Sequence, residues 1–100
     1  QRNRLVLPDG STVFPYFGNH DEYKAITPEV LQFQFIQHGV DEIEKRMVVS
    51  APLTPEQEEA TRELMVRNLG HPFRITFTYL DEIPPGPRGK YEEFISKVDA

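Results

Sequence analysis

A proline- and glycine-rich loop near the end of the chain carries the residue best suited to chemistry. The segment Ile83–Lys90 reads IPPGPRGK. The prolines limit the shapes of this loop and the glycines let it adjust, so Lys90 is suited to reach an anionic ligand. A lysine in the first turn of a helix also opposes the helix dipole, which costs a few tenths of a kcal/mol. The alternative is a surface lysine at a glycine-rich turn, and the residues alone favour that plainer interpretation.

The other reactive residue types form no catalytic or metal-binding pattern. His20, His38 and His71 fall in or beside separate predicted turns, without the short spacing of a metal-binding pair. The serines lie outside Gly-x-Ser-x-Gly settings, and cysteine is absent. Several glutamates share one predicted helix, where most of them favour its amino-terminal end: Glu56, Glu58, Glu59 and Glu63. We therefore expect no metal site and no complete active site in this chain.

Composition and charge limit the classes of partner. The chain has 100 residues, which fits one domain spanning residues 1–100, and its first residue is Gln1 rather than methionine, as expected of an excised piece. A net charge of -5 argues against nucleic-acid binding. No apolar run approaches the roughly 20 residues of a membrane span, so no membrane partner is expected. The absence of cysteine and of a visible secretory signal favours a cytoplasmic location.

Hydrophobic periodicity and turn residues predict the elements that must position these side chains. Alternating apolar residues predict strands, and Thr54-Pro55 with Gln57 predicts a capped helix that ends at Gly70. In chain order, we expect a hairpin of 5–7 with 12–14, a short helix 21–26 capped by Asp21, strands 30–38 and 44–50, a helix 55–69, a strand 73–79 and a final helix from Tyr91 to Val98.

These elements predict an α+β fold with a small mixed or antiparallel sheet and helices on one face. The order resembles a split βαβ unit preceded by a β-hairpin. No repeat and no long linker divides the chain, so it forms a single domain.

Two short motifs resemble those of known enzymes. The loop Ile83–Lys90 resembles the last signature loop of adenylate-forming enzymes, in which an apolar residue and a proline precede Gly-Lys. The segment Gly10–Pro15 resembles the Gly-x-Asn-Val-Phe-Pro segment of phenylacetate–CoA ligases. The family's Gly-Arg-x-Asp-Asp hinge is represented only by Gln1–Arg4, and its Pro-x-x-Ile-Glu helix start is replaced by Pro15–Gly18. On these motifs the chain is identified as a carboxyl-terminal domain similar to that of phenylacetate–CoA ligases.

The resemblance implies the mobile carboxyl-terminal domain of an ATP-dependent ligase, inactive when isolated. The full enzyme would join a carboxylic acid to ATP, giving an acyl-adenylate, and then transfer the acyl group to CoA as a thioester. ATP and Mg²⁺ would be bound mainly by a preceding amino-terminal domain, and the acyl substrate stays open. The residue roles implied are a catalytic Lys90, loop support by Gly86, Arg88 and Gly89, a hinge at Arg2, Asn3 and Arg4, and a surface for thioester formation at Gly10, Ser11 and Thr12.

Two other function classes stay open. A split βαβ sandwich can serve as a small-ligand-binding regulatory module of ferredoxin-like type, which is an analogy of fold alone. The chain could also be an interaction domain that uses Phe14, Tyr16 and Phe17 as an exposed contact patch.

Overall fold

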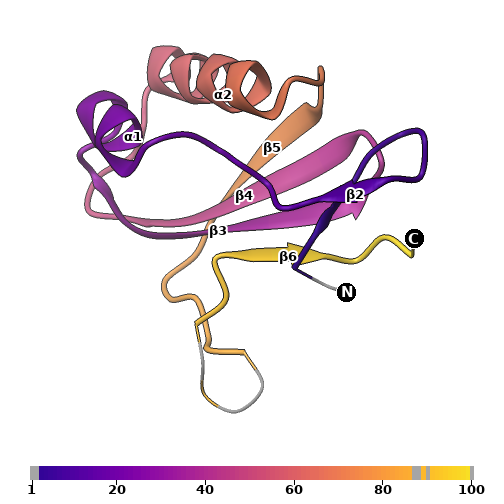
Figure 1. Cartoon of the computed structure of the whole chain (residues 1–100). Helices are drawn as coiled ribbons and strands as arrows, with labels where there is room; N and C mark the ends of the chain where they lie inside the picture. Colours follow the sequence, from indigo (N-terminus) through magenta and orange to yellow (C-terminus); the bar gives the residue numbers. More distant parts are fainter. Residues whose placement is uncertain (1–2, 87–88, 90, 100) are drawn as a thin grey trace.

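Both helices lie on one face of the larger sheet, and a short hairpin packs beside them (Figure 1). The computed structural model describes residues 3–86, 89 and 91–99. In chain order the elements are β1 Leu5–Val6, β2 Thr12–Val13, α1 His20–Ile26, β3 Val30–Gly39, β4 Glu42–Val49, α2 Pro55–Leu69, β5 Arg74–Tyr79 and β6 Phe94–Ser96. The predicted α+β class, with a mixed sheet, helices on one face and a preceding hairpin, is confirmed.

The larger sheet has the strand order β5-β4-β3-β6. Strands β3 and β4 form an antiparallel hairpin, whereas β5 runs parallel to β4 and β6 runs parallel to β3. The segment β4-α2-β5 is therefore a βαβ unit whose strands pair directly, without the inserted strand of a split unit. This order places β3 and β4 at the centre of the sheet.

Helix α2 begins and ends at the residues that its sequence indicates. Thr54 Oγ1 accepts a hydrogen bond from Gln57 N at 3.1 Å, and Gln57 Oε1 accepts one from Thr54 N at 2.8 Å. Gly70 ends the helix with φ +75°, a left-handed conformation that glycine adopts without steric cost. The predicted capping box and stop signal of this helix are confirmed.

The cap of helix α1 lies two residues earlier than predicted, at Asn19 rather than Asp21. Asn19 Oδ1 accepts a hydrogen bond from Asp21 N at 2.8 Å, while Glu22 Oε1 accepts one from Asn19 N at 3.0 Å. The choice of Asp21 was wrong because Asn19 and Glu22 satisfy the free amides of the first turn reciprocally.

The core lies between the helices and the helix-facing side of the sheet. Alternation along the strands points Phe35, Ile43 and Ile75 toward Leu64 and Met65 of α2, and all are at most 4% exposed. Burying a side chain of this size contributes roughly 1.5–3 kcal/mol. The stacked rings of Phe17 and Phe35, with centroids 3.8 Å apart, extend the core toward α1. Phe17 therefore packs against the core and does not share the exposure of Phe14 and Tyr16.

The last predicted helix is wrong, because the segment forms strand β6 instead. Phe35 N donates to Glu93 O at 2.8 Å, and Lys97 N donates to Gln37 O at 2.9 Å. These bonds pair the outer edge of β3, which a helix at this place would leave unsatisfied. The helical spacing of Tyr91, Phe94, Ile95 and Val98 extends over too few residues to outweigh that pairing.

Candidate functional site

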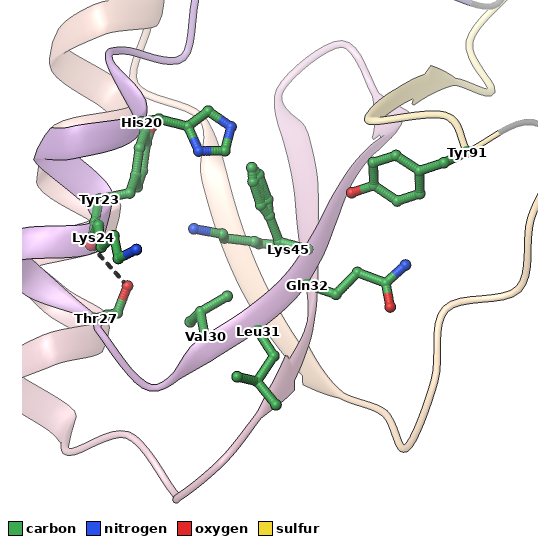
Figure 2. Close-up of a pocket in the computed structure, with 10 residues that line it drawn as sticks. His20, Tyr23, Lys24, Thr27, Val30, Leu31, Gln32, Lys45 and Tyr91 are labelled. Atoms are coloured by element: carbon green, nitrogen blue, oxygen red, sulfur yellow. Dashed lines mark hydrogen bonds between the residues drawn. The ribbon is translucent and has the colours of Figure 1, made fainter.

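A pocket of about 330 Å³ opens between α1 and the first half of β3 (Figure 2). Helix α1 supplies one wall through His20, Tyr23 and Lys24, and Tyr91 lies on the opposite side. The pocket exists because β6 pairs with β3 only at residues 35–37, so that β6 does not cover residues 30–33. Its volume lies near the lower end of the roughly 300–1,000 Å³ typical of small-molecule sites.

Lys45 reaches this pocket from the centre of the sheet (Figure 2). It lies on β4 between Ile43 and Met47, whose side chains share its face and are fully buried. The side chain of Lys45 is itself only 1% exposed. A lysine so deeply buried is unusual unless it has a partner.

Aromatic rings surround the ammonium group of Lys45. Its Nζ lies 4.4 Å from the ring centroid of Tyr23, 5.1 Å from that of Phe33 and 5.3 Å from that of Phe35. Each distance is within the range of a cation–π interaction, which is worth roughly 0.5–2 kcal/mol. Among the described residues, no hydrogen bond or ion pair to this ammonium is found.

Burial lowers the pKa of Lys45 to about 8, from an ordinary value of 10.5. The carboxylate of Glu93 opposes this shift, although the described residues show no ion pair between it and Lys45. A lysine without a nearby counter-charge loses hydration and recovers little of it from the protein. The pocket therefore contains a cation that is weakly stabilised by its surroundings.

Two further side chains with titratable groups line the pocket. Lys24 and His20 line it, and His20 Nε2 is 3.7 Å from Glu93 Oε1. Burial raises the pKa of Tyr23, and that hydroxyl donates a hydrogen bond to Phe17 O. Tyr23 therefore stays neutral and presents its ring, rather than a charge, to Lys45.

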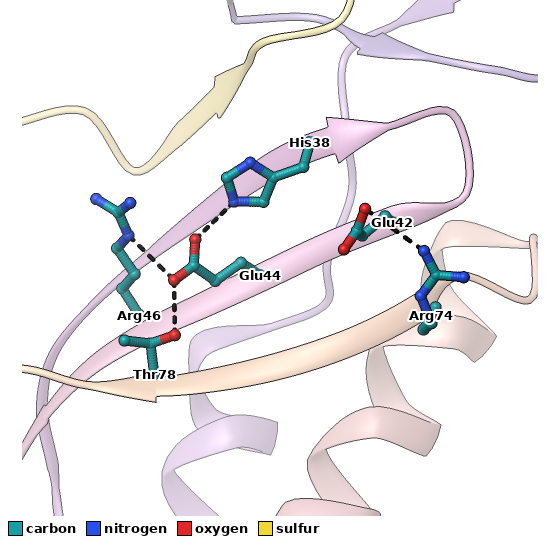
Figure 3. A network of polar contacts seen from close by, with 6 residues as sticks. All are labelled: His38, Glu42, Glu44, Arg46, Arg74 and Thr78. Carbon is teal, nitrogen blue, oxygen red and sulfur yellow. Dashed lines mark hydrogen bonds and ion pairs between the residues drawn. The ribbon is translucent and has the colours of Figure 1, made fainter.

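The opposite face of β4 holds a compact polar network centred on Glu44 (Figure 3). Glu44 accepts hydrogen bonds from Thr78 Oγ1 at 2.6 Å and is joined to His38 Nε2 at 2.7 Å. Arg46 Nε lies 3.3 Å from Glu44 Oε2, the oxygen that also accepts the hydrogen bond from Thr78. Burial alone would raise the pKa of Glu44, but the hydrogen bonds and the charge of Arg46 outweigh it and lower this pKa. The network is fully paired and therefore fits a structural role.

The residues predicted to do chemistry lie elsewhere or outside the described part. Lys90, Arg88 and Arg2 lie outside the described residues. Gly86 and Gly89 are joined by a hydrogen bond from Gly89 N to Gly86 O at 3.0 Å, and Gly89 has φ +72°.

The predicted hinge and thioester-surface residues meet in the hairpin. Arg4 donates to Thr12 Oγ1 and Thr12 O, both at 3.2 Å, and its guanidinium lies 4.3 Å from the ring centroid of Phe14. Ser11 donates to Asp9 Oδ1 from its hydroxyl at 2.6 Å, and Gly10 allows the turn with φ +88°. Asn3 is exposed beside them. These residues line no part of the Lys45 pocket.

Sequence reasoning missed Lys45, although one signal marks it. Ile43, Lys45 and Met47 alternate along one strand, so the lysine must share the buried face with its two apolar neighbours. The return strand was predicted from residue 44 onward, which left Ile43 out and hid this alternation.

The described part of the chain contains neither a group of side chains that could hold a metal ion nor a helix that could span a membrane. No group of three or more histidine, aspartate or glutamate side chains there is arranged to hold a metal ion. No helix within residues 3–86, 89 and 91–99 is long and apolar enough to cross a membrane.

Comparison with known proteins gives one family match. Residues 5–97 match a family model described as the CapK C-terminal domain. No curated protein matches the chain. The identification as a phenylacetate–CoA ligase-like member of the adenylate-forming superfamily is wrong, because the matching model is of a different family. The two motifs behind that identification are short runs rich in glycine and proline, which turns of unrelated proteins also use.

Proposed function

The chain belongs to the CapK C-terminal domain family, and on that premise we propose that it works with a preceding part of a longer protein. We propose for the whole protein the activity of an ATP-dependent acyl-adenylating ligase. It would join a carboxylic acid to ATP, release pyrophosphate and transfer the acyl group to CoA. The domain is the mobile part that supplies a cation to this reaction.

The observation that carries the proposal is the anchored connection between β5 and β6. Its described parts leave the sheet on the side away from the helices (Figure 1). Ile83 fixes the connection on one side, where it is 6% exposed. On the other side Glu92 O accepts a hydrogen bond from Gln34 Nε2 at 2.8 Å. In the sequence, Lys90 lies between these two anchored residues, which supports the proposal that the connection serves a partner surface.

Adenylation needs a positive charge near the α-phosphate, where negative charge develops in the transition state. During adenylation the carboxylate attacks the α-phosphate, and a positioned ammonium group is worth several kcal/mol in a water-poor site. We assign this role to Lys90. ATP and Mg²⁺ would be held mainly by the preceding part of the protein, because the described residues offer no metal-binding group. Gly10, Ser11 and Thr12 of the hairpin would face that part during thioester formation, with the pivot at Arg2, Asn3 and Arg4.

The test uses the full-length protein and separates the two half-reactions. Acid-dependent exchange of labelled pyrophosphate into ATP measures adenylation, with aliphatic, aromatic and hydroxy acids as substrates. Lys90→Ala should lower this exchange by about a hundredfold or more, since it removes a charge that acts in the transition state. Thioester formation from supplied acyl-adenylate should stay within a few-fold of the original protein.

A matched control is Lys97→Ala, which removes an exposed lysine just after β6. It should leave both half-reactions unchanged. Equal loss of both half-reactions in Lys90→Ala would contradict the assigned role, and acyl-adenylate formation by the 100-residue chain alone would contradict the two-part enzyme.

The second candidate is a small-ligand-binding regulatory module. One observation favours it, the pocket in which Lys45 lies buried without an ion-pair partner among the described residues. Such a module would bind its ligand without ATP and without the preceding part of the protein. Ligand binding by the isolated chain, combined with no acid-dependent exchange in the full-length protein, would favour this candidate over the ligase.

A further inference from the structure

We propose that the Lys45 pocket binds a small carboxylate with a flat, apolar body. This inference deepens the second candidate function and rests on the pocket alone, whichever reaction the whole protein performs. The carboxylate would meet the ammonium group of Lys45, and the flat body would lie among the aromatic side chains that line the pocket.

The first argument is the unsatisfied hydrogen-bonding capacity of Lys45. An ammonium group has three N–H donors and no acceptor. No acceptor for them is found among the described residues, although the side chain is 1% exposed. No fully buried side-chain nitrogen or oxygen of the described residues lacks a hydrogen-bond partner, so Nζ itself keeps contact with the open space of the pocket. A ligand oxygen that enters the pocket would take the place of solvent as the acceptor for these donors.

The second argument is the shape of the aromatic surroundings. The rings of Tyr23 and Phe33 approach Nζ within 4.4 and 5.1 Å, and these two residues also line the pocket. Ring faces attract a cation but offer it no strong hydrogen-bond acceptor. They do provide flat apolar surfaces against which a planar ligand can stack. Tyr91, opposite α1, adds a further ring to the lining.

The third argument is charge. Lys24 lines the same pocket as Lys45. The carboxylate of Glu93 lies 3.7 Å from His20 and forms no ion pair with Lys45 among the described residues. The local balance therefore favours an anion. A phosphate group would favour several convergent N–H donors, such as arginine forks or a row of backbone amides. No arginine is among the described lining residues, so a carboxylate fits this single buried ammonium better.

The test compares simple probes on the 100-residue chain. Benzoate is titrated by NMR or calorimetry beside benzamide, which has the same shape without the charge, and acetate, which has the charge without the ring. Benzoate should bind at least tenfold more tightly than either. Inorganic phosphate should bind more weakly than benzoate. This comparison needs no variant and so does not depend on the folding of a mutant.

Variants then locate the site. Lys45→Met should weaken benzoate binding at least tenfold, while the matched exposed change Lys97→Met should leave it unchanged. Glu93→Gln should tighten binding by a few-fold, because it removes the carboxylate that opposes an anion at this pocket. Chemical-shift changes on adding benzoate should centre on Tyr23, Phe33 and Tyr91.

The pH dependence of binding provides an independent readout. The titratable or charged groups facing Lys45 are His20, Tyr23 and Lys24 on α1, with Tyr91 and Glu93 ahead of β6. Because the pKa of Lys45 is about 8, benzoate affinity should fall as the pH rises above 8, where binding must first return a proton to the amine. Lys45→Met should lack that decline.

Equal affinity for benzoate and benzamide, tighter binding of phosphate, or full benzoate affinity in Lys45→Met would each overturn the proposal. No benzoate binding at 10 mM, roughly the weakest affinity of a useful site, would do so as well. The Lys90→Ala variant separates this proposal from the ligase, because it should lose pyrophosphate exchange and keep benzoate binding.

Discussion

Two neighbouring residues of β4, Glu44 and Lys45, point to opposite faces of the sheet and meet opposite surroundings. Glu44 contacts Thr78, His38 and Arg46 within 3.3 Å. Lys45 is more deeply buried and meets the rings of Tyr23, Phe33 and Phe35, with no ion pair among the described residues.

This difference indicates a structural role for the charge of Glu44 and makes Lys45 a candidate for ligand binding. The partners of Glu44 hold its pKa below the ordinary value, so that folding gains from its charge. Burial lowers the pKa of Lys45 as well, but for a lysine this means that folding loses from its charge. A residue that costs stability without a structural partner is a better candidate for ligand binding than one that is fully paired.

The largest expected effect comes from Lys45→Met, which should stabilise the domain. The gap between a pKa of about 8 and the ordinary 10.5 corresponds to about 3 kcal/mol as an upper bound. The folded state holds this proton less tightly than the unfolded state, so the original protein gains stability as the pH rises from about 8 to 10.5. The advantage of Lys45→Met should thus be greatest near pH 7 and fade toward pH 10.5.

Urea unfolding of both proteins between pH 7 and 10 measures this difference. The tyrosines contribute to both proteins alike, so their effect largely cancels in the comparison. A Lys45→Met variant that is less stable at pH 7 would show that the aromatic rings stabilise the charge after all, and the contrast with Glu44 would disappear.

The next effect is that of Glu44→Gln, which should destabilise the domain by about 1–3 kcal/mol at pH 7. The neutral amide leaves Arg46 without its counter-charge and replaces one acceptor oxygen with a donor. Because the pKa of Glu44 is lowered on folding, its contribution is present above the unfolded pKa and lost as the pH falls through the folded value.

Thermal unfolding from pH 7 down to pH 3 should therefore show the two proteins converging in stability. The matched control is Glu42→Gln on the same strand, where the carboxylate is more exposed and lies 3.5 Å from Arg74. That change should stay within about 0.5 kcal/mol of the original protein. A larger loss at Glu42 than at Glu44 would mean that the network does not account for the difference.

The smallest effect is expected from Thr78→Val, which removes one donor from Glu44 and keeps the shape of the side chain. The cost should be about 0.5–1.5 kcal/mol, the usual worth of one hydrogen bond. The pKa of Glu44 should rise, since the bond from Thr78 helps to lower it. NMR titration of the Glu44 carboxyl measures that rise, and an unchanged pKa would remove Thr78 from the network.

The parts of the fold that local signals decide were predictable from the sequence. Thr54, Pro55 and Gln57 fix the start of α2 through atoms within one turn, and Gly70 fixes its end. The hairpin turn at Asp9-Gly10 and the alternation of β5 are equally local. Each of these signals acts between residues close in the chain, so it can be recognised before any tertiary contact is known.

The features that the sequence did not predict depend on contacts between residues far apart in the chain. Strand β6 forms because the edge of β3 lies free near Phe35, about sixty positions earlier in the chain. The pocket around Lys45 forms because β6 stops short of residues 30–33 and α1 passes above them. The loop with Lys90 was chosen for its local motif, and its chemical role stays a prediction.

The side chain of Gln37 on β3 is hydrogen-bonded to both the first strand, β1, and the last strand, β6. It is fully buried, accepts a hydrogen bond from Val6 N at 3.0 Å and donates one to Val6 O at 2.8 Å. Its Oε1 also accepts a hydrogen bond from Ser96 Oγ at 2.9 Å. A pull on the chain ahead of β1 is therefore shared with β3 and β6 at a single residue. Loss of the Gln37 side chain would therefore free both the first strand and the last strand from the centre of the sheet at once.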